Sequence, residues 1–344
     1  MRRDNLDLLR LLAAAAVLVS HGLLISGGEE PVVIGALSVG AVGVLVFFSI
    51  SGYLVTLSWL RDPHVLRFGL KRATRIYPAY VVLLIATAFV IGPAVTTAGD
   101  YLAGGDPARY VVDNLTLRMG YLLPGVFSDN PTEVVNGSLW SLRYETRVYA
   151  LLLILGALGA LRRRWLATVL LASAQVVLAV GDQHLVVRAF CLAILIALWR
   201  DEIPWRWSIA AGLLGAWVAS SAAGAAGYVA PLVIPYLTLM LAYRAPAVTE
   251  LTTTRRGAPW DVSYGLYLWA FPVCQVIEHL WHPAAWVLIA AGFVVTYLLA
   301  AASWTLIERP ALVAVKARLQ GSAHGHGSIP RAAATVPASV TSSG

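Results

Sequence analysis

The sequence has few charged residues and very few cysteines, and each shortage argues against a class of protein. Only 12% of the 344 residues are Asp, Glu, Lys or Arg, against roughly 25% in soluble domains. Such a chain cannot cover its apolar surface with its own polar side chains, so a soluble globular protein is excluded. The two cysteines, Cys191 and Cys274, both lie in apolar segments, which argues against a disulfide framework.

Apolar residues dominate instead: 59% of the chain is hydrophobic and the mean hydropathy is +0.73. A bilayer offers the backbone no hydrogen-bond partners, so apolar segments that cross it form helices. Several segments are shorter than the roughly 20 residues of a straight span. The pattern predicts an all-α, polytopic transmembrane helical bundle of about ten spans. We expect one membrane domain over residues 1–312 and a disordered cytoplasmic tail over 313–344. The apolar segments are 6–27, 32–58, 78–99, 138–160, 165–181, 184–199, 207–223, 226–243, 261–281 and 285–306.

Most of the basic residues are predicted to lie on one side of the membrane. A net charge of +7 would by itself suit a nucleic-acid partner. With a cytoplasmic N-terminus and alternating spans, however, the basic clusters fall on the inner side, as the positive-inside rule requires. We therefore expect both termini in the cytoplasm and the long connection 100–137 outside. The expected partner is a lipid bilayer, that of the cell membrane, and not nucleic acid. Of the 25 Lys and Arg residues, five fall elsewhere: Arg109, Arg118, Arg143, Arg147 and Arg188.

The first span carries ionisable side chains, which are costly in a membrane and therefore indicate function. Arg10 and His21 are eleven residues apart. This spacing places them on one face of a helix, about 16 Å apart along its axis. Asp7 lies one turn before Arg10 and is placed to pair with it. The structural alternative is an arginine that extends to the interface and a histidine that packs within the bundle.

The fourth span carries a carboxylate, Glu145, in the segment NGSLWSLRYE. If the midpoints of the first and fourth spans are level, Glu145 lies at about the depth of His21. A carboxylate beside an imidazole fixes its tautomer and raises its basicity, so we expect Glu145 to orient His21. The alternative is that Arg143 and Arg147, which flank Glu145, neutralise it.

A basic cluster, Lys71, Arg72 and Arg75, precedes Pro78 near the predicted start of the third span. Basic side chains beside a helix N-terminus form an anion site. Ordinary positive-inside charge is the alternative interpretation.

Two further segments predict features of the bundle. Ser49, Ser51 and Gly52 form a patch of small residues in the second span. Such a patch lets helices approach closely, or leaves room for a slender ligand. At the other end of the chain, the segment Glu308-Arg309-Pro310 is predicted to end the tenth span.

Six segments occur in order along the chain: DLLR with His21, FFSISGYL, RATRIYPAY, NGSLWSLRYE, SYGLYLW and IERP. Together they resemble the acyltransferase-3 family of integral membrane O-acyltransferases, in the stand-alone form without a fused SGNH domain. The resemblance covers residues 1–312. It implies acyl transfer from acyl-CoA, expected to be acetyl-CoA, to a hydroxyl of a glycan or another cell-surface or secondary-metabolite acceptor. Family members often have His after the Leu-Trp of the ninth span, where this chain has Ala270.

The resemblance also implies roles for individual residues. The functional Arg and His of the family's first helix correspond to Arg10 and His21, and the basic motif associated with acyl-CoA corresponds to Arg72 and Arg75. No metal is expected. We expect His21 and Glu145 to be catalytic, Arg10, Ser51, Lys71, Arg72 and Arg75 to bind acyl-CoA, and Trp140, Ser141 and Tyr264 to bind the acceptor.

A second function class fits part of the same pattern. A proton-coupled transporter or flippase without acyl transfer would also use ten spans with buried Arg, His and Glu. Many such carriers are built from inverted repeats, and no internal repeat is visible in the sequence. The expected enzyme would use His21 as a general base on the acceptor hydroxyl or as a nucleophile that carries the acyl group. Consumption of acyl-CoA distinguishes enzyme from carrier.

Overall fold

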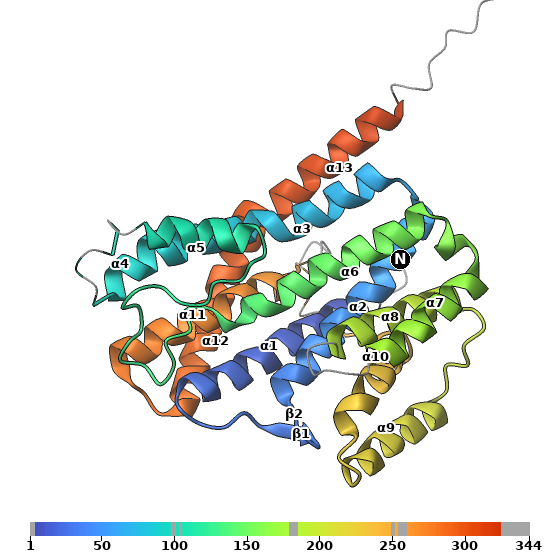
Figure 1. Ribbon diagram of the computed structural model, residues 1–344, viewed down its shortest axis with the longest axis horizontal. Helices are drawn as coiled ribbons and strands as arrows, with labels where there is room; N and C mark the ends of the chain where they lie inside the picture. The colour runs from blue at the N-terminus through green and yellow to red at the C-terminus, as the bar shows by residue number, and fades with distance from the viewer. Residues whose placement is uncertain are drawn as a thin grey trace, which may run out of the picture.

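The computed structural model describes residues 4–324 except 98, 100, 103–104, 179–184, 249–251 and 254–259. These described residues are almost entirely helical (Figure 1), which confirms the all-α class. The count of ten spans stays a prediction. The turn expected at 181–183 and the tail from residue 325 lie outside the described residues. Within the described part, five helical segments are long and apolar enough to cross a membrane: Leu6–Ile25, Val39–Arg61, Val65–Val95, Ala226–Arg244 and Ala285–Gln320.

The second span begins later than predicted. After α1 (Leu6–Ile25), the apolar residues from 32 onward form a short antiparallel hairpin of β1 (Val32–Ile34) and β2 (Leu37–Ser38). Gly35 turns the chain there with a φ of +64°, which a glycine adopts without steric cost. The side chain of Ser38 then accepts a hydrogen bond from the amide of Ala41 and caps α2 (Val39–Arg61). Hydropathy cannot separate an apolar strand from an apolar helix of this length, so the prediction of a helix from residue 32 was wrong.

The third helix begins earlier than predicted. α3 (Val65–Ala86) contains Pro78 in its interior and continues through a π-helical turn, Thr87–Ile91, into α4 (Gly92–Val95). Residues 65–77 are helical but too polar to stand out as an apolar span. The proline removes only one backbone hydrogen bond, a loss that membrane helices tolerate when neighbouring elements pack around them. The basic cluster therefore lies inside a helix and not ahead of one.

The long connection 100–137 is folded against the bundle. It contains α5 (Asp106–Leu115) and ends in a 3₁₀ turn, Gly137–Leu139, that leads into α6 (Trp140–Ala157). Two asparagines fasten it: Asn130 donates to the side chain of Gln275 at 2.7 Å, and Asn136 donates to the carbonyl of Leu268 at 3.1 Å. These bonds hold the start of α6 beside α11.

The last helix does not stop at Glu308-Arg309-Pro310. α12 passes through a π-helical turn, Trp304–Glu308, and continues as α13 to His324. The predicted structural stop was therefore wrong, and the first part of the predicted disordered tail, from residue 313 to 324, is helical.

The remaining elements are a 3₁₀ turn, Ala160–Arg162, α7 (Arg164–Val177), α8 (Leu185–Leu198), α9 (Trp207–Ser221), α10 (Ala226–Arg244), α11 (Ser263–Trp281), α12 (Ala285–Ser303) and α13 (Arg309–His324).

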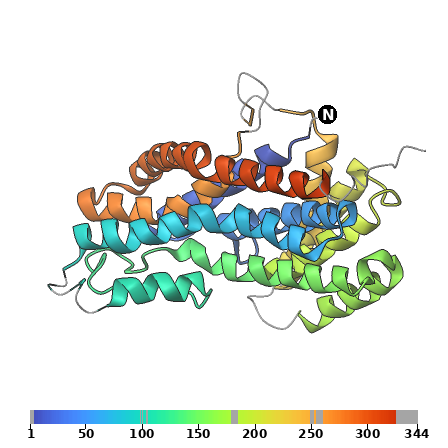
Figure 2. The same ribbon diagram turned by 90° about the horizontal axis from the view of Figure 1, so that it is seen from above.

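The helices run side by side along the long axis of the molecule (Figures 1 and 2). α1 packs against α2, α11 and α12, and α2 packs in turn against α8. A side chain at Gly52 would place its Cβ 2.7 Å from the carbonyl oxygen of Phe190 on α8. Gly52 therefore permits the close helix packing that the small-residue patch predicts. The α2–α3 and α6–α7 turns lie at one end, on the right of Figure 1, and α4 and α5 lie toward the other.

Candidate active site

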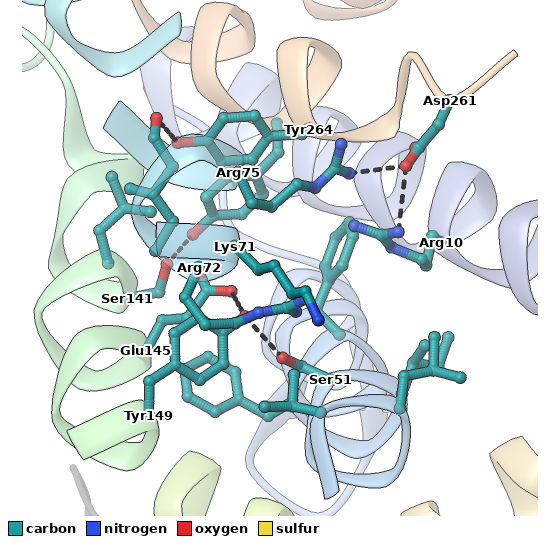
Figure 3. A pocket seen from close by; sticks show the side chains of 18 of the residues that line it. Arg10, Ser51, Lys71, Arg72, Arg75, Ser141, Glu145, Tyr149, Asp261 and Tyr264 are labelled. Carbon is teal, nitrogen blue, oxygen red and sulfur yellow. Dashed lines mark hydrogen bonds and ion pairs between the residues drawn. The ribbon is translucent and has the colours of Figure 1, made fainter. Parts of the chain in front are cut away.

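A cavity of about 330 Å³ lies between α1, α2, α3, α6, α11 and the helix that runs from α12 into α13. Most of the predicted site residues line it, although they come from five separate helices (Figure 3). Two do not: His21 and Trp140 are absent from its walls. The predicted residues that line the cavity are Arg10, Ser51, Lys71, Arg72, Arg75, Ser141, Glu145 and Tyr264.

One carboxylate organises the arginines of the cavity. Asp261 Oδ2 lies 3.1 Å from Arg10 Nη1 and 2.6 Å from Arg75 Nη2 (Figure 3). Arg10 thus pairs with Asp261 and not with Asp7, which nevertheless also lines the cavity. Ser263 Oγ donates to the other carboxylate oxygen of Asp261 at 2.6 Å, which fixes the carboxylate at the start of α11. The sequence reasoning did not identify Asp261, although an acidic residue directly before an apolar span is a visible signal.

A second carboxylate contacts Arg75 from the opposite side. Glu308 Oε2 lies 3.7 Å from Arg75 Nη1, and Ser303 Oγ donates to Glu308 Oε1 at 2.8 Å. The π-helical turn at 304–308 adds a residue to that turn of the helix and so changes the direction in which Glu308 points. The guanidinium of Arg75 also lies over the ring of Tyr264, 5.4 Å from its centroid. Glu308 therefore contacts Arg75, a residue of the cavity wall, which its interpretation as a helix stop did not anticipate.

The basic cluster of α3 divides into residues with different surroundings. Its members lie in the second and third turns of α3, so the free amides of a helix N-terminus do not contribute to an anion site there, contrary to the prediction. Lys71 Nζ pairs with Asp62 Oδ2 at 2.7 Å. Arg72 instead lies over the ring of Tyr149, 5.9 Å from its centroid. Its buried Nε has no hydrogen-bond partner among the residues that the structure describes.

Part of the cavity wall is lined by hydroxyl groups that bond to one another. Tyr149 donates to the carboxylate of Glu145, and its hydroxyl also lies 2.8 Å from Ser51 Oγ. Ser141 Oγ lies 2.6 Å from the hydroxyl of Tyr267, which donates to the carbonyl of Ser138 at 2.9 Å. The Tyr264 hydroxyl is already used by the backbone, because it donates to the carbonyl of Ile76 at 2.8 Å. Tyr267, which lay unremarked within SYGLYLW, belongs to this wall.

His21 lies outside the cavity, next to Ser138, whose carbonyl accepts the hydrogen bond from Tyr267. Its Nδ1 is 3.4 Å from Ser138 Oγ, and its ring meets the ring of Phe271 edge to face at 5.1 Å. In the described part of the chain, no hydrogen bond is formed by Nε2. The imidazole is therefore held on one side, while its second nitrogen is free to meet a hydroxyl.

The predicted contact between His21 and Glu145 is absent from the described structure. His21 faces Ser138, which precedes Glu145 by seven residues, or about 10 Å along a helix. The prediction placed the midpoints of the two spans level, but α1 and α6 are staggered along their axes. Glu145 bonds to Tyr149 instead, so it cannot orient the imidazole directly.

Two features noted in the sequence lie outside the cavity. Trp140 packs against Tyr144 with ring centroids 5.8 Å apart. Ala270, at the position where relatives often have His, is fully buried in α11 next to Phe271, which contacts His21.

Comparison with known proteins fits this geometry. The sequence profile of the acyltransferase 3 family, described as an acyltransferase domain, matches residues 3–305. An O-acetyl transferase of Shigella phage Sf6 is 27% identical over 90% of this chain and 96% of its own length. Nodulation protein 10 of Rhizobium leguminosarum bv. viciae is 29% identical over 90% of this chain and 93% of its own length. No solved structure matches the chain. The resemblance inferred from the six segments is confirmed, and the chain belongs to the acyltransferase 3 family and is an O-acyltransferase.

Proposed function

We propose that this protein transfers an acetyl group from acetyl-CoA to a hydroxyl of a saccharide, within the cell membrane. The name of the phage relative, an O-acetyl transferase, supports acetyl as the group transferred. The membership of the family favours an enzyme over the transporter or flippase that the buried charges would also suit.

The observation that supports the proposal is which side chains line the cavity and how they connect to His21. Arg10, Arg72 and Arg75 line the cavity, and so does the Ser141–Tyr267 pair. Tyr267 bonds to the backbone of Ser138, whose side chain contacts His21. Arg10 and His21 are about 16 Å apart along α1. A long, thin donor with phosphates at one end and a thioester at the other matches this arrangement, with the thioester presented near His21.

The chemistry needs one proton acceptor. In the proposed reaction the acceptor oxygen attacks the thioester carbonyl, a C–O bond forms and the C–S bond breaks. His21 Nε2 takes the hydroxyl proton and returns it to the leaving thiolate, so that ester and free thiol are the products. Alternatively His21 Nε2 first attacks the thioester carbonyl, the C–S bond breaks and the thiolate leaves. The acceptor hydroxyl then attacks the acyl-imidazole, the C–N bond breaks, and the hydroxyl proton goes to the thiolate. Under this proposal Ser138 holds the imidazole, the role that Glu145 was expected to fill.

The reaction is tested with the purified protein in liposomes that contain a soluble saccharide acceptor. We expect release of CoA thiol beyond one equivalent per protein only when the acceptor is present, and in the amount of the ester formed on the saccharide. Movement of the saccharide across the liposome without thiol release would favour the carrier and contradict the proposal.

The same proposal includes a direction across the membrane, with both termini and the arginine end of the cavity in the cytoplasm. Cys191 and Cys274 are free and buried, so a single introduced cysteine can be labelled against a low background. Ser128 is exposed in the connection expected outside, and Asp201 in a turn expected inside. We expect Ser128→Cys to react with an impermeant reagent in intact cells and Asp201→Cys to react only after lysis. The reverse pattern would invert the orientation.

A further inference from the structure

The cations that line the cavity differ in whether they already have a counter-ion. Arg10 and Arg75 share Asp261, and Arg75 also contacts Glu308. Lys71 is paired with Asp62. Among the described residues that line the cavity, Arg72 is the cation with no carboxylate at ion-pair distance. Lys71 and Arg72, which are adjacent in the chain, therefore have different electrostatic surroundings.

The fixed pairs are well buried and held at both ends. The side chains of Arg75 and Asp261 are 14% and 13% exposed, and that of Glu308 is 3% exposed. Ser263 and Ser303 donate to the two carboxylates, and Tyr264 covers the guanidinium of Arg75. An anionic ligand that took Arg75 would leave the buried Glu308 without a cation and Asp261 with Arg10 alone, which is costly.

Binding of an anionic ligand to Arg72 would break no ion pair. Its guanidinium lies over Tyr149, whose hydroxyl is fixed by Glu145 and Ser51, so the ring is a firm platform. Its buried Nε lacks a partner in the described part of the chain, and a buried donor without a partner gains the full value of a hydrogen bond when a ligand supplies an acceptor.

We propose that Asp261 is a positioning residue that, together with Glu308, holds Arg10 and Arg75 as a fixed wall of the cavity, and that Arg72 is the cation left to bind the phosphates of the donor. The inference rests on the proposed donor, acyl-CoA. It separates the roles of Arg72 and Arg75, which the basic motif alone would treat as equivalent.

The test compares binding of CoA and of pantetheine, which has the same thiol arm without the phosphates. The readout is the ratio of the two dissociation constants, measured on the purified full chain. Damage to the fold lowers the binding-competent fraction for both ligands alike, so a purely structural effect leaves this ratio unchanged. Loss of one charge-assisted hydrogen bond to phosphate is worth roughly tenfold or more in affinity.

We expect Arg72→Ala to lower the preference for CoA about tenfold or more. Asp261→Asn keeps the shape but removes the charge that balances Arg10 and Arg75, so the preference should rise about threefold or more. Arg67→Ala is the matched control, because Arg67 lies on the same helix, pairs with Asp62 and does not line the cavity. Its ratio should equal that of the wild type.

Three results would overturn the inference: a wild type that binds both ligands equally, an unchanged ratio in Arg72→Ala, or a lowered ratio in Asp261→Asn. A wild type that prefers CoA but never transfers an acyl group would contradict the proposed reaction instead. In that case the ratios of the variants still decide the assignment of Arg72 and Asp261.

Discussion

His21→Ala is expected to reduce acyl transfer by about 10²–10⁴-fold, the typical value of a general base, and by more if the histidine carries the acyl group. The expectation follows from the place of His21 next to the hydroxyl-lined part of the cavity, with Nδ1 at Ser138 Oγ. The measurement is turnover at equal amounts of folded protein in liposomes. Donor binding should survive, because the arginine part of the cavity lies about 16 Å away along α1.

A histidine elsewhere on the chain provides the control. His282 is exposed at the end of α11 with a φ of +42°, a conformation that asparagine also tolerates. His282→Asn should therefore keep wild-type transfer. If His21→Ala retains more than about a tenth of the wild-type rate at equal folding, general-base help of the expected size is absent and the mechanism proposed here is wrong. Rapid quenching in denaturant at neutral pH separates the two mechanisms, because only a nucleophilic His21 would retain the acyl group in the denatured protein.

Arg75→Ala is expected to lower the free energy of unfolding by about 3–5 kcal/mol, because it leaves the buried carboxylate of Glu308 without a cation and removes one of the two cations that contact Asp261. Asp261 keeps Arg10, but Glu308 has no other cation at ion-pair distance among the described residues. The measurement is resistance to unfolding in detergent, at a pH where carboxylates are ionised.

The same substitution at the surface gives the comparison. The Arg67–Asp62 pair is 38% and 27% exposed, and exposed pairs contribute at most about 1 kcal/mol. Arg67→Ala should therefore unfold almost as the wild type does. Adding Glu308→Gln to Arg75→Ala should restore part of the lost stability, since a neutral amide is cheaper to bury than an unpaired charge. Equal stabilities of Arg75→Ala and Arg67→Ala would contradict the assigned role of Arg75.

Much of the fold was predictable because it depends on local composition. Low charge and long apolar segments require helices in a bilayer, and the predicted and observed bounds of α10 differ by one residue. The errors arose where hydropathy is a poor guide to secondary structure. The hairpin at Val32–Ser38 is apolar without being helical, and the first turns of α3 are helical without being apolar.

The candidate residues were predictable for a related reason. Charged and imidazole side chains within apolar helices are costly, so those present attract attention one by one. The sequence by itself selected the side chains that are expected to carry chemistry, and eight of the ten selected line one cavity.

Only the tertiary structure decided which of these side chains meet. Asp261 joins Arg10 and Arg75 from positions more than 180 residues apart, and His21 meets Ser138 and not Glu145. Periodicity within a helix specifies the face on which a residue lies. It does not specify the axial offset or the rotation of that helix against its neighbours, because those depend on packing between side chains distant in sequence. The packing that brings Ser138, seven residues before Glu145, to His21 is invisible in either segment alone, and it replaces one partner of His21 with another.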